Sequence, residues 1–99
     1  MLKLQKQIIG VSVDEGKLPI EVKLWVSVIQ VPYFITKPLH LSQKLIGSKA
    51  DGSIFSFYLV PNFELEQALL MYGERVKVLM PLDLQVKMKK RLGEALELY

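Results

Sequence analysis

The amino-acid sequence predicts a single α+β domain. Residues 21–27 and 53–60 are rich in β-branched and aromatic residues, and in the first run aliphatic residues recur at every second position, which indicates strands. Residues 62–72 and 82–99 instead have apolar residues at helical spacing. The chain has 99 residues and no cysteine. A chain of this length buries enough surface to form one compact core without disulfides.

The first strand is expected at residues 21–27. Lys23, Trp25 and Ser27 would share one face of this strand and Val22, Leu24 and Val26 the other. The face with Val22, Leu24 and Val26 is therefore expected to pack in the core.

A short helix is expected at residues 28–36. The apolar pattern alone would extend the strand through Val31, but Pro32 cannot donate to a strand ladder. Ser27 offers a helix cap, and Pro32 falls early enough in the helix to be tolerated. Pro38 disfavours helical backbone at Lys37, which ends the segment.

A hairpin is expected next. Its first strand covers residues 41–48, and the turn dipeptide Asp51-Gly52 marks the connection at residues 49–52. The second strand, residues 53–60, is almost continuously apolar, which is typical of a central strand. Phe55 and Phe57 are expected to face the core.

The third part of the chain is expected to run helix, strand, helix. Asn62 is a favoured N-cap residue, and Gly73 supplies the backbone freedom that ends a helix. Residues 75–80 then alternate as a strand, and Pro81 opens the last helix. That helix should pair Asp83 with Lys87 and Lys90 with Glu94, and it carries one apolar stripe: Leu84, Met88, Leu92, Ala95, Leu96 and Tyr99.

The predicted order is that of a ferredoxin-like βαββαβ fold with an additional C-terminal helix. Residues 19–99 form this domain. Residues 1–18 are interpreted as a lead-in that either lies on this domain or belongs against a preceding one.

Composition excludes several classes of function. The net charge of +3 is spread along the chain rather than gathered in the basic stripe of a nucleic-acid binder. The only histidine has no clustered carboxylates, so we expect no metal site and no cofactor. No nucleophile elbow, paired catalytic carboxylates or phosphate loop occurs, and we expect a non-enzyme with no catalytic residues. No apolar run reaches membrane-spanning length and no export signal is recognised, which favours a cytoplasmic location without membrane contact.

Two sets of residues are candidates for binding. His40 and Gln43, together with Arg75 and Lys77, could contact an anion or a partner; alternatively, the first pair holds a loop and the second pair protects an edge strand by its charge. The second set consists of apolar residues on faces expected to be polar, and it marks either an interface or a surface that the last helix covers: Trp25, Phe63, Leu70, Met71 and Val86.

Several short motifs together resemble a known family. In order and spacing they are similar to the C-terminal extension (WCX) domain that follows the WYL domain in bacterial WYL-domain transcriptional regulators. The match covers residues 8–99, and Ala68 departs from it because the family often has Trp there. The motifs are Lys37-Pro38-Leu39-His40, Ser42-Gln43, Asp51-Gly52-Ser53, Tyr72-Gly73-Glu74-Arg75-Val76-Lys77-Val78-Leu79, Ala95-Leu96 and Leu98-Tyr99.

The resemblance implies a regulatory and oligomerisation module, with a homodimer as the expected assembly. In the family, DNA is read by an N-terminal winged helix-turn-helix domain and effectors are sensed mainly by the WYL domain, and neither domain is present in these residues. Contact with DNA is therefore expected only through the parent chain. Two alternatives stay open: a small effector-binding domain for a nucleotide or metabolite, with a cleft near His40, Gln43 and Arg75, and direct binding of single-stranded nucleic acid.

Overall fold

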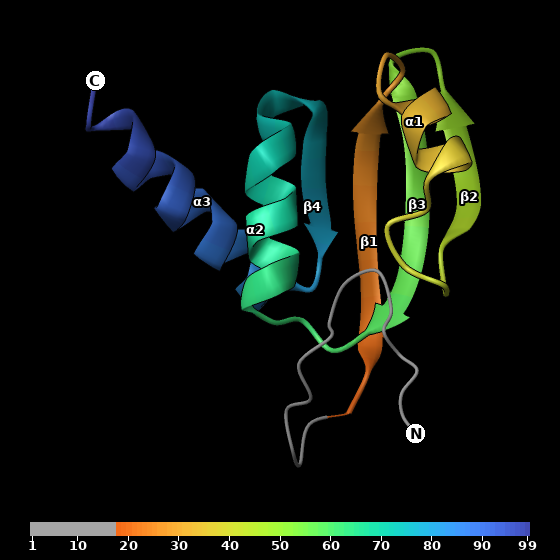
Figure 1. Cartoon of the computed structure of the whole chain (residues 1–99), viewed down its shortest axis with the longest axis horizontal. Helices are drawn as coiled ribbons and strands as arrows, with labels where there is room; N and C mark the ends of the chain where they lie inside the picture. Colours follow the sequence, from red (N-terminus) through yellow and green to blue (C-terminus); the bar gives the residue numbers. More distant parts are fainter. Residues whose placement is uncertain (1–17) are drawn as a thin grey trace.

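The fold is a four-stranded antiparallel sheet covered on one face by helices (Figure 1). The structure is a computed structural model and describes residues 18–99. The interpretation of residues 1–18 as a lead-in therefore falls almost wholly outside the described residues. The elements in chain order are β1 (Ile20–Ser27), α1 (Val31–Thr36), β2 (Lys44–Lys49), β3 (Gly52–Leu59), α2 (Phe63–Tyr72), the 3₁₀ turn η2 (Gly73–Arg75), β4 (Val76–Met80) and α3 (Leu82–Leu96).

The sheet has the strand order β2-β3-β1-β4, with β1 antiparallel to both β3 and β4. Helices α1 and α2 lie on the same face of this sheet, and α3 is added after β4 (Figure 1). The predicted ferredoxin-like α+β fold with an extra C-terminal helix is confirmed.

The core lies between the sheet and the two helices on its covered face. Alternation along β1 buries Val22, Leu24 and Val26 completely, as predicted. Phe55 and Phe57 of β3 also face the core, and the Phe34 ring of α1 lies 5.6 Å from the Phe55 ring. Burial of apolar area of this kind is the main source of folding stability.

Helix α1 begins three residues later than predicted. A turn over residues 28–30 comes first, and the Ser27 hydroxyl accepts a 3.4 Å hydrogen bond from the Ile29 N–H within that turn. Gln30 is the N-cap residue and makes no side-chain cap hydrogen bond. Ser27 thus ends β1 and does not cap the helix, while Pro32 lies in the first turn where its missing N–H costs nothing.

Strand β2 also begins three residues later than predicted, at Lys44. The backbone and side chains of residues 39–43 bond to one another and to neighbouring elements, which keeps residues 41–43 out of the ladder. In the hairpin, Ala50 and Asp51 form the turn and Gly52 is already the first residue of β3, paired with Lys49.

Helix α2 has the predicted ends. The Asn62 side chain accepts a 2.9 Å hydrogen bond from the Leu65 N–H, and Gly73 ends the helix at φ 57°. Residues with a Cβ atom rarely adopt that backbone angle, so glycine is required there. Arg75 belongs to the short 3₁₀ turn after the helix and not to the strand that was predicted to start with it.

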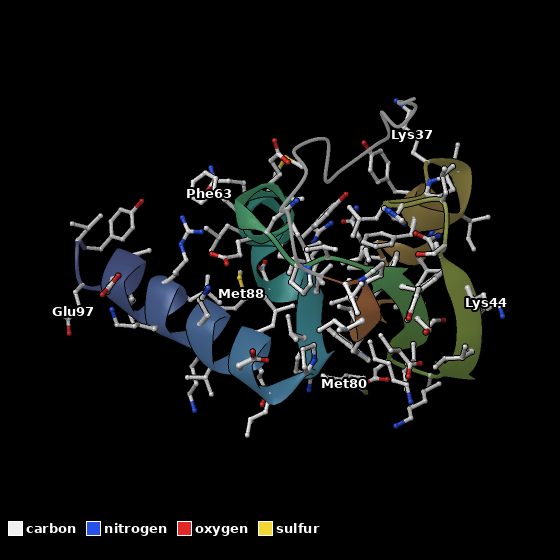
Figure 2. All side chains as sticks on the ribbon, turned by 90° about the horizontal axis from the view of Figure 1, so that it is seen from below. Lys37, Lys44, Phe63, Met80, Met88 and Glu97 are labelled. Carbon is white, nitrogen blue, oxygen red and sulfur yellow. The ribbon has the colours of Figure 1, made fainter. Side chains whose placement is uncertain are left out.

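Only the first half of helix α3 packs against the rest of the domain. Leu84 and Met88 are buried in the core, but Leu92 is 44% exposed and Leu96 is 73% exposed. The helix leaves the edge of the sheet and its C-terminal end projects from the domain (Figures 1 and 2). The apolar stripe predicted for the whole helix is therefore covered only at its start.

Candidate functional site

His40 and Gln43 lie in the loop that connects α1 to β2. The Gln43 side chain accepts a hydrogen bond from the Leu39 N–H and donates one to the Phe34 carbonyl, both at 2.9 Å. Both the oxygen and the nitrogen of its amide are therefore hydrogen-bonded, and the side chain joins the loop to α1. Leu39, between these contacts, inserts its side chain into the core.

His40 and Ser42 fix the other end of this loop. The Ser42 N–H donates to His40 Nδ1 at 3.1 Å, so Nδ1 is an unprotonated acceptor, and the Ser42 hydroxyl lies 2.8 Å from the same nitrogen. That hydroxyl also accepts a 2.8 Å hydrogen bond from the Tyr58 N–H of β3. Burial lowers the pKa of His40 from 6.5, because desolvation disfavours the charged imidazolium. The contacts that the structure gives these two residues hold the loop.

Arg75 and Lys77 lie at the opposite edge of the sheet. Arg75 is exposed in the 3₁₀ turn, and Lys77 of β4 places its ammonium nitrogen 5.5 Å from the centre of the Trp25 ring. An ammonium over an indole is attracted by the negative face of the ring. Lys77 thus packs on the open face of the sheet.

The structure does not bring His40 and Gln43 together with Arg75. Ser42 bonds to Tyr58, which pairs with Glu21 of β1, whereas β4 starts beside Val26. Five residues of extended strand separate these positions by about 16 Å, and β2 and β4 are opposite edges of the sheet. The cleft expected near His40, Gln43 and Arg75 is therefore not formed.

The open face of the sheet carries two aromatic residues. Trp25 is half-buried and Tyr58 is exposed, but Tyr58 pairs with Glu21, four residues from Trp25 along β1. About 13 Å of strand separates the two positions, which leaves no continuous stacking platform for successive bases.

Three residues of the expected interface set lie on α2. Phe63 and Met71 are 64% and 74% exposed, while Leu70 is partly buried against the core. The Arg91 guanidinium of α3 lies 5.2 Å from the centre of the Phe63 ring, yet most of the Phe63 side chain stays exposed. Helix α3 therefore does not cover this face of α2, and Val86 of α3 is itself exposed.

Glu66 and Gln67 of α2 hold α3 by polar contacts, and Gln67 accepts a 2.9 Å hydrogen bond from Arg91. Glu66, which is largely buried, accepts a 2.9 Å hydrogen bond from Arg91 and lies 3.4 Å from the Lys87 ammonium. Lys87 was predicted to pair with Asp83 and is drawn to Glu66 instead, whereas the predicted Lys90–Glu94 pair is present at 3.0 Å. Beyond these contacts the apolar stripe of α3 continues into solvent: Leu92, Leu96, Leu98 and Tyr99.

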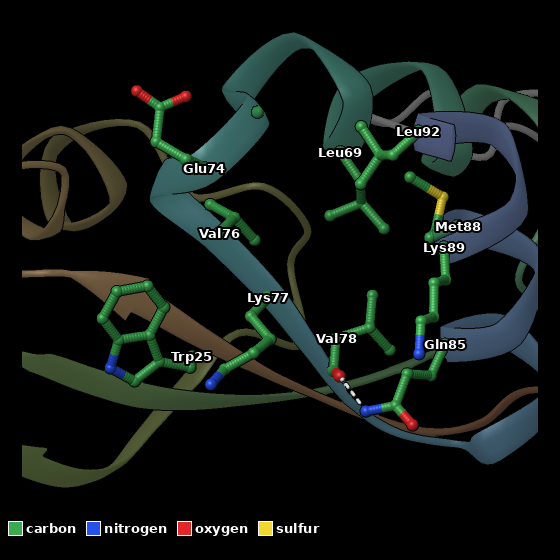
Figure 3. A pocket seen from close by; sticks show the side chains of 11 residues that line it. Trp25, Leu69, Glu74, Val76, Lys77, Val78, Gln85, Met88, Lys89 and Leu92 are labelled. Atoms are coloured by element: carbon green, nitrogen blue, oxygen red, sulfur yellow. Dashed lines mark hydrogen bonds between the residues drawn. The ribbon is translucent and has the colours of Figure 1, made fainter. Parts of the chain in front are cut away.

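A cavity of about 580 Å³ opens between β4 and α3, and sequence reasoning missed it (Figure 3). Its lining residues come from five separate segments, so no local pattern marks it. The one available signal was the apolar stripe of α3, which continues through Leu92 beyond the residues that the core needs.

Two classes of site find no support in the described residues. No group of three or more His, Asp and Glu side chains in residues 18–99 is placed to hold a metal ion. Over the same residues, none of the helices combines the length and the apolar character needed to cross a membrane.

Comparison with known proteins identifies the family. No curated protein matches the chain. The family model described as WCX domain matches residues 18–96, which include every strand and helix of the fold. The chain therefore belongs to the WCX domain family.

Proposed function

We propose that this WCX domain is the C-terminal regulatory and oligomerisation module of a WYL-type transcriptional regulator, and that its work is mechanical rather than catalytic. It pairs two subunits, and the DNA-binding domains of the parent chains then meet a two-fold operator at a fixed spacing. Membership of the WCX family supports the regulatory setting.

One observation carries the oligomerisation role. The last two turns of α3 project beyond the domain with Leu96 and Tyr99 exposed on the stripe that Leu84 and Met88 begin. A short helix end is marginal in water without packing on an apolar partner. A second apolar surface, formed by Phe63 and Met71, lies uncovered on α2.

We infer that the occupant of these surfaces is a second copy of the chain. A two-fold contact places the same patch on both subunits, so the α3 end of one copy packs on the equivalent helices of the other. On α3 the apolar stripe lies on one side, and Lys90 and Glu94 pair outside that stripe. An apolar centre bordered by charged residues is typical of a subunit interface.

The test is the molar mass in solution, measured by analytical ultracentrifugation over a wide range of protein concentration. The wild-type chain is expected to pass from monomer to dimer as the concentration rises. Leu96→Asp and Met71→Asp are each expected to shift this equilibrium strongly to the monomer, because a buried unpaired carboxylate is costly. Leu41→Asp is the matched control, since Leu41 is 80% exposed in the loop before β2.

Two results would contradict the proposal. One is a chain that stays monomeric at the highest concentration. The other is a dimer that dissociates equally in all three variants, because a general effect of charge would then replace a specific surface.

A further inference from the structure

The cavity between β4 and α3 is an apolar groove with polar groups at its rim. Its apolar lining is contributed by α2, β4 and α3, and Trp25 of β1 closes the end beside Lys77 (Figure 3). The volume of about 580 Å³ lies within the range of small-molecule sites. The apolar residues are Leu69, Val76, Val78, Met88 and Leu92.

The backbone edge of β4 inside this groove is already partly occupied. Gln85 Nε2 donates a 2.9 Å hydrogen bond to the Val78 carbonyl, shown as the dashed line in Figure 3. An added peptide strand would need that carbonyl for its own ladder. The groove is thus less suited to a strand than to a compact ligand that lies on the side chains.

Two positive charges at the groove have no carboxylate partner among residues 18–99. Lys77 lies over the Trp25 ring, and neither Lys77 nor Lys89 makes an ion pair within the described chain. The Lys89 ammonium points towards Gln85 and β4, whereas the Glu74 carboxylate points away from both lysines (Figure 3). The polar rim is therefore complementary to one negative charge.

We propose that this groove binds a small amphipathic carboxylate. The ligand's apolar chain lies on Val76, Met88 and Leu92, and its carboxylate lies at the rim near Lys89 and Gln85. The flexible thioether of Met88 adapts to chains of different shape. The inference does not depend on the oligomerisation role proposed above.

Octanoate is the probe, used at neutral pH below its micelle-forming concentration, with octan-1-ol as the uncharged control. Trp25 is the only tryptophan of the chain, so its fluorescence reports directly on the groove. Methyl ¹³C NMR of the methionines adds a second, local readout. Octanoate is expected to shift the Met88 methyl signal saturably and to leave that of Met71, which is exposed on α2, unchanged.

Variants of Lys89 test the charge. Lys89→Gln is expected to weaken octanoate binding roughly two- to fivefold, the range of an exposed ion pair, and to leave octan-1-ol binding unchanged. Lys89→Glu is expected to weaken it further. Lys44→Glu makes the same change of net charge on β2, outside the groove, and is expected to bind octanoate within about twofold of the wild type.

Any of these results of the titrations would overturn the proposal: octan-1-ol binding as tightly as octanoate, a Met88 signal that does not move, or equal weakening by Lys89→Glu and Lys44→Glu. The titration is repeated with Leu96→Asp. Saturable binding by that variant alone would assign the groove to a second copy and would also overturn the proposal, whereas binding by both forms supports it whatever the molar mass.

Discussion

The imidazole of His40 accepts a hydrogen bond at Nδ1 from the Ser42 N–H, and protonation at that nitrogen would remove the acceptor. The Ser42 hydroxyl in turn accepts from the Tyr58 N–H, so the charge state of one side chain affects the attachment of a whole loop to β3. Burial acts in the same direction, because it lowers the pKa of His40.

Stability is therefore expected to depend on pH through His40. Its folded-state pKa is lowered from 6.5, so the unfolded chain binds the proton more readily; the contribution is present above pH 6.5 and is lost as pH falls through the folded-state pKa. His40→Asn supplies an acceptor oxygen that does not titrate. Urea unfolding at about pH 7.5 and about pH 5.5 should show a smaller pH-dependent loss of unfolding free energy in the variant. Equal losses in both proteins would contradict this account.

Gly52 is required for packing rather than for the turn. A Cβ atom there would collide with the Val26 carbonyl and lie 2.8 Å from Trp25 Nε1. Gly52→Ala is expected to lower the free energy of unfolding by about 1–3 kcal/mol, the usual cost of overpacking. Gly93→Ala is the control: it has nothing within 4 Å in exposed helix and should raise stability by up to about 1 kcal/mol. Thermal unfolding of both variants measures these changes. A Gly52→Ala variant as stable as the wild type would exclude the collision.

At the scale of elements, the motifs that carry the resemblance to the family are mostly structural joints. Leu39 fills the core, Gln43 joins the loop to α1, and Ser42 joins it to β3. A spacing such as Lys37 to Gln43 could be recognised from the sequence, but these contacts could not, because their partners lie up to sixteen residues away.

Glu66 is the carboxylate that pairs α2 with Lys87 and Arg91 of α3, while Gln67 accepts a further hydrogen bond from Arg91. Glu66→Ala is expected to lower the free energy of unfolding by about 1–2 kcal/mol, below the full cost of breaking a buried pair because Lys87 and Arg91 regain water. Glu94→Ala breaks the exposed pair with Lys90 and should cost less than about 0.5 kcal/mol. Chemical denaturation at low protein concentration compares the two variants. Equal losses of unfolding free energy in the two variants would contradict a stabilising role of the Glu66 ion pairs.

At the scale of the whole molecule, the sequence predicted the order of the elements and the covered face of the sheet, because both follow from local periodicity and turn residues. Val22, Leu24 and Val26 alternate, Asn62 caps and Gly73 ends a helix, each within a few residues. The direction of α3 was not predictable in this way. Contacts between residues far apart in the chain join α3 to α2, among them the ion pairs of Glu66 with Lys87 and Arg91. The cavity follows from that direction, so it was missed for the same reason.

Removal of residues 94–99 tests the role in subunit contact that we propose for the end of α3. These residues are exposed, and the ion pair that their removal breaks within the described part of the chain is Lys90–Glu94, so at low protein concentration the free energy of unfolding is expected to change by less than about 0.5 kcal/mol. The dimer, in contrast, should be lost. The wild-type melting temperature is then expected to rise with protein concentration, because association stabilises the folded chain, while that of the shortened chain stays constant. Scanning calorimetry over a range of concentrations measures both effects. A loss above about 2 kcal/mol at low concentration would show that the end of α3 packs on its own domain, and a melting temperature that still rises after the removal would place the subunit contact elsewhere.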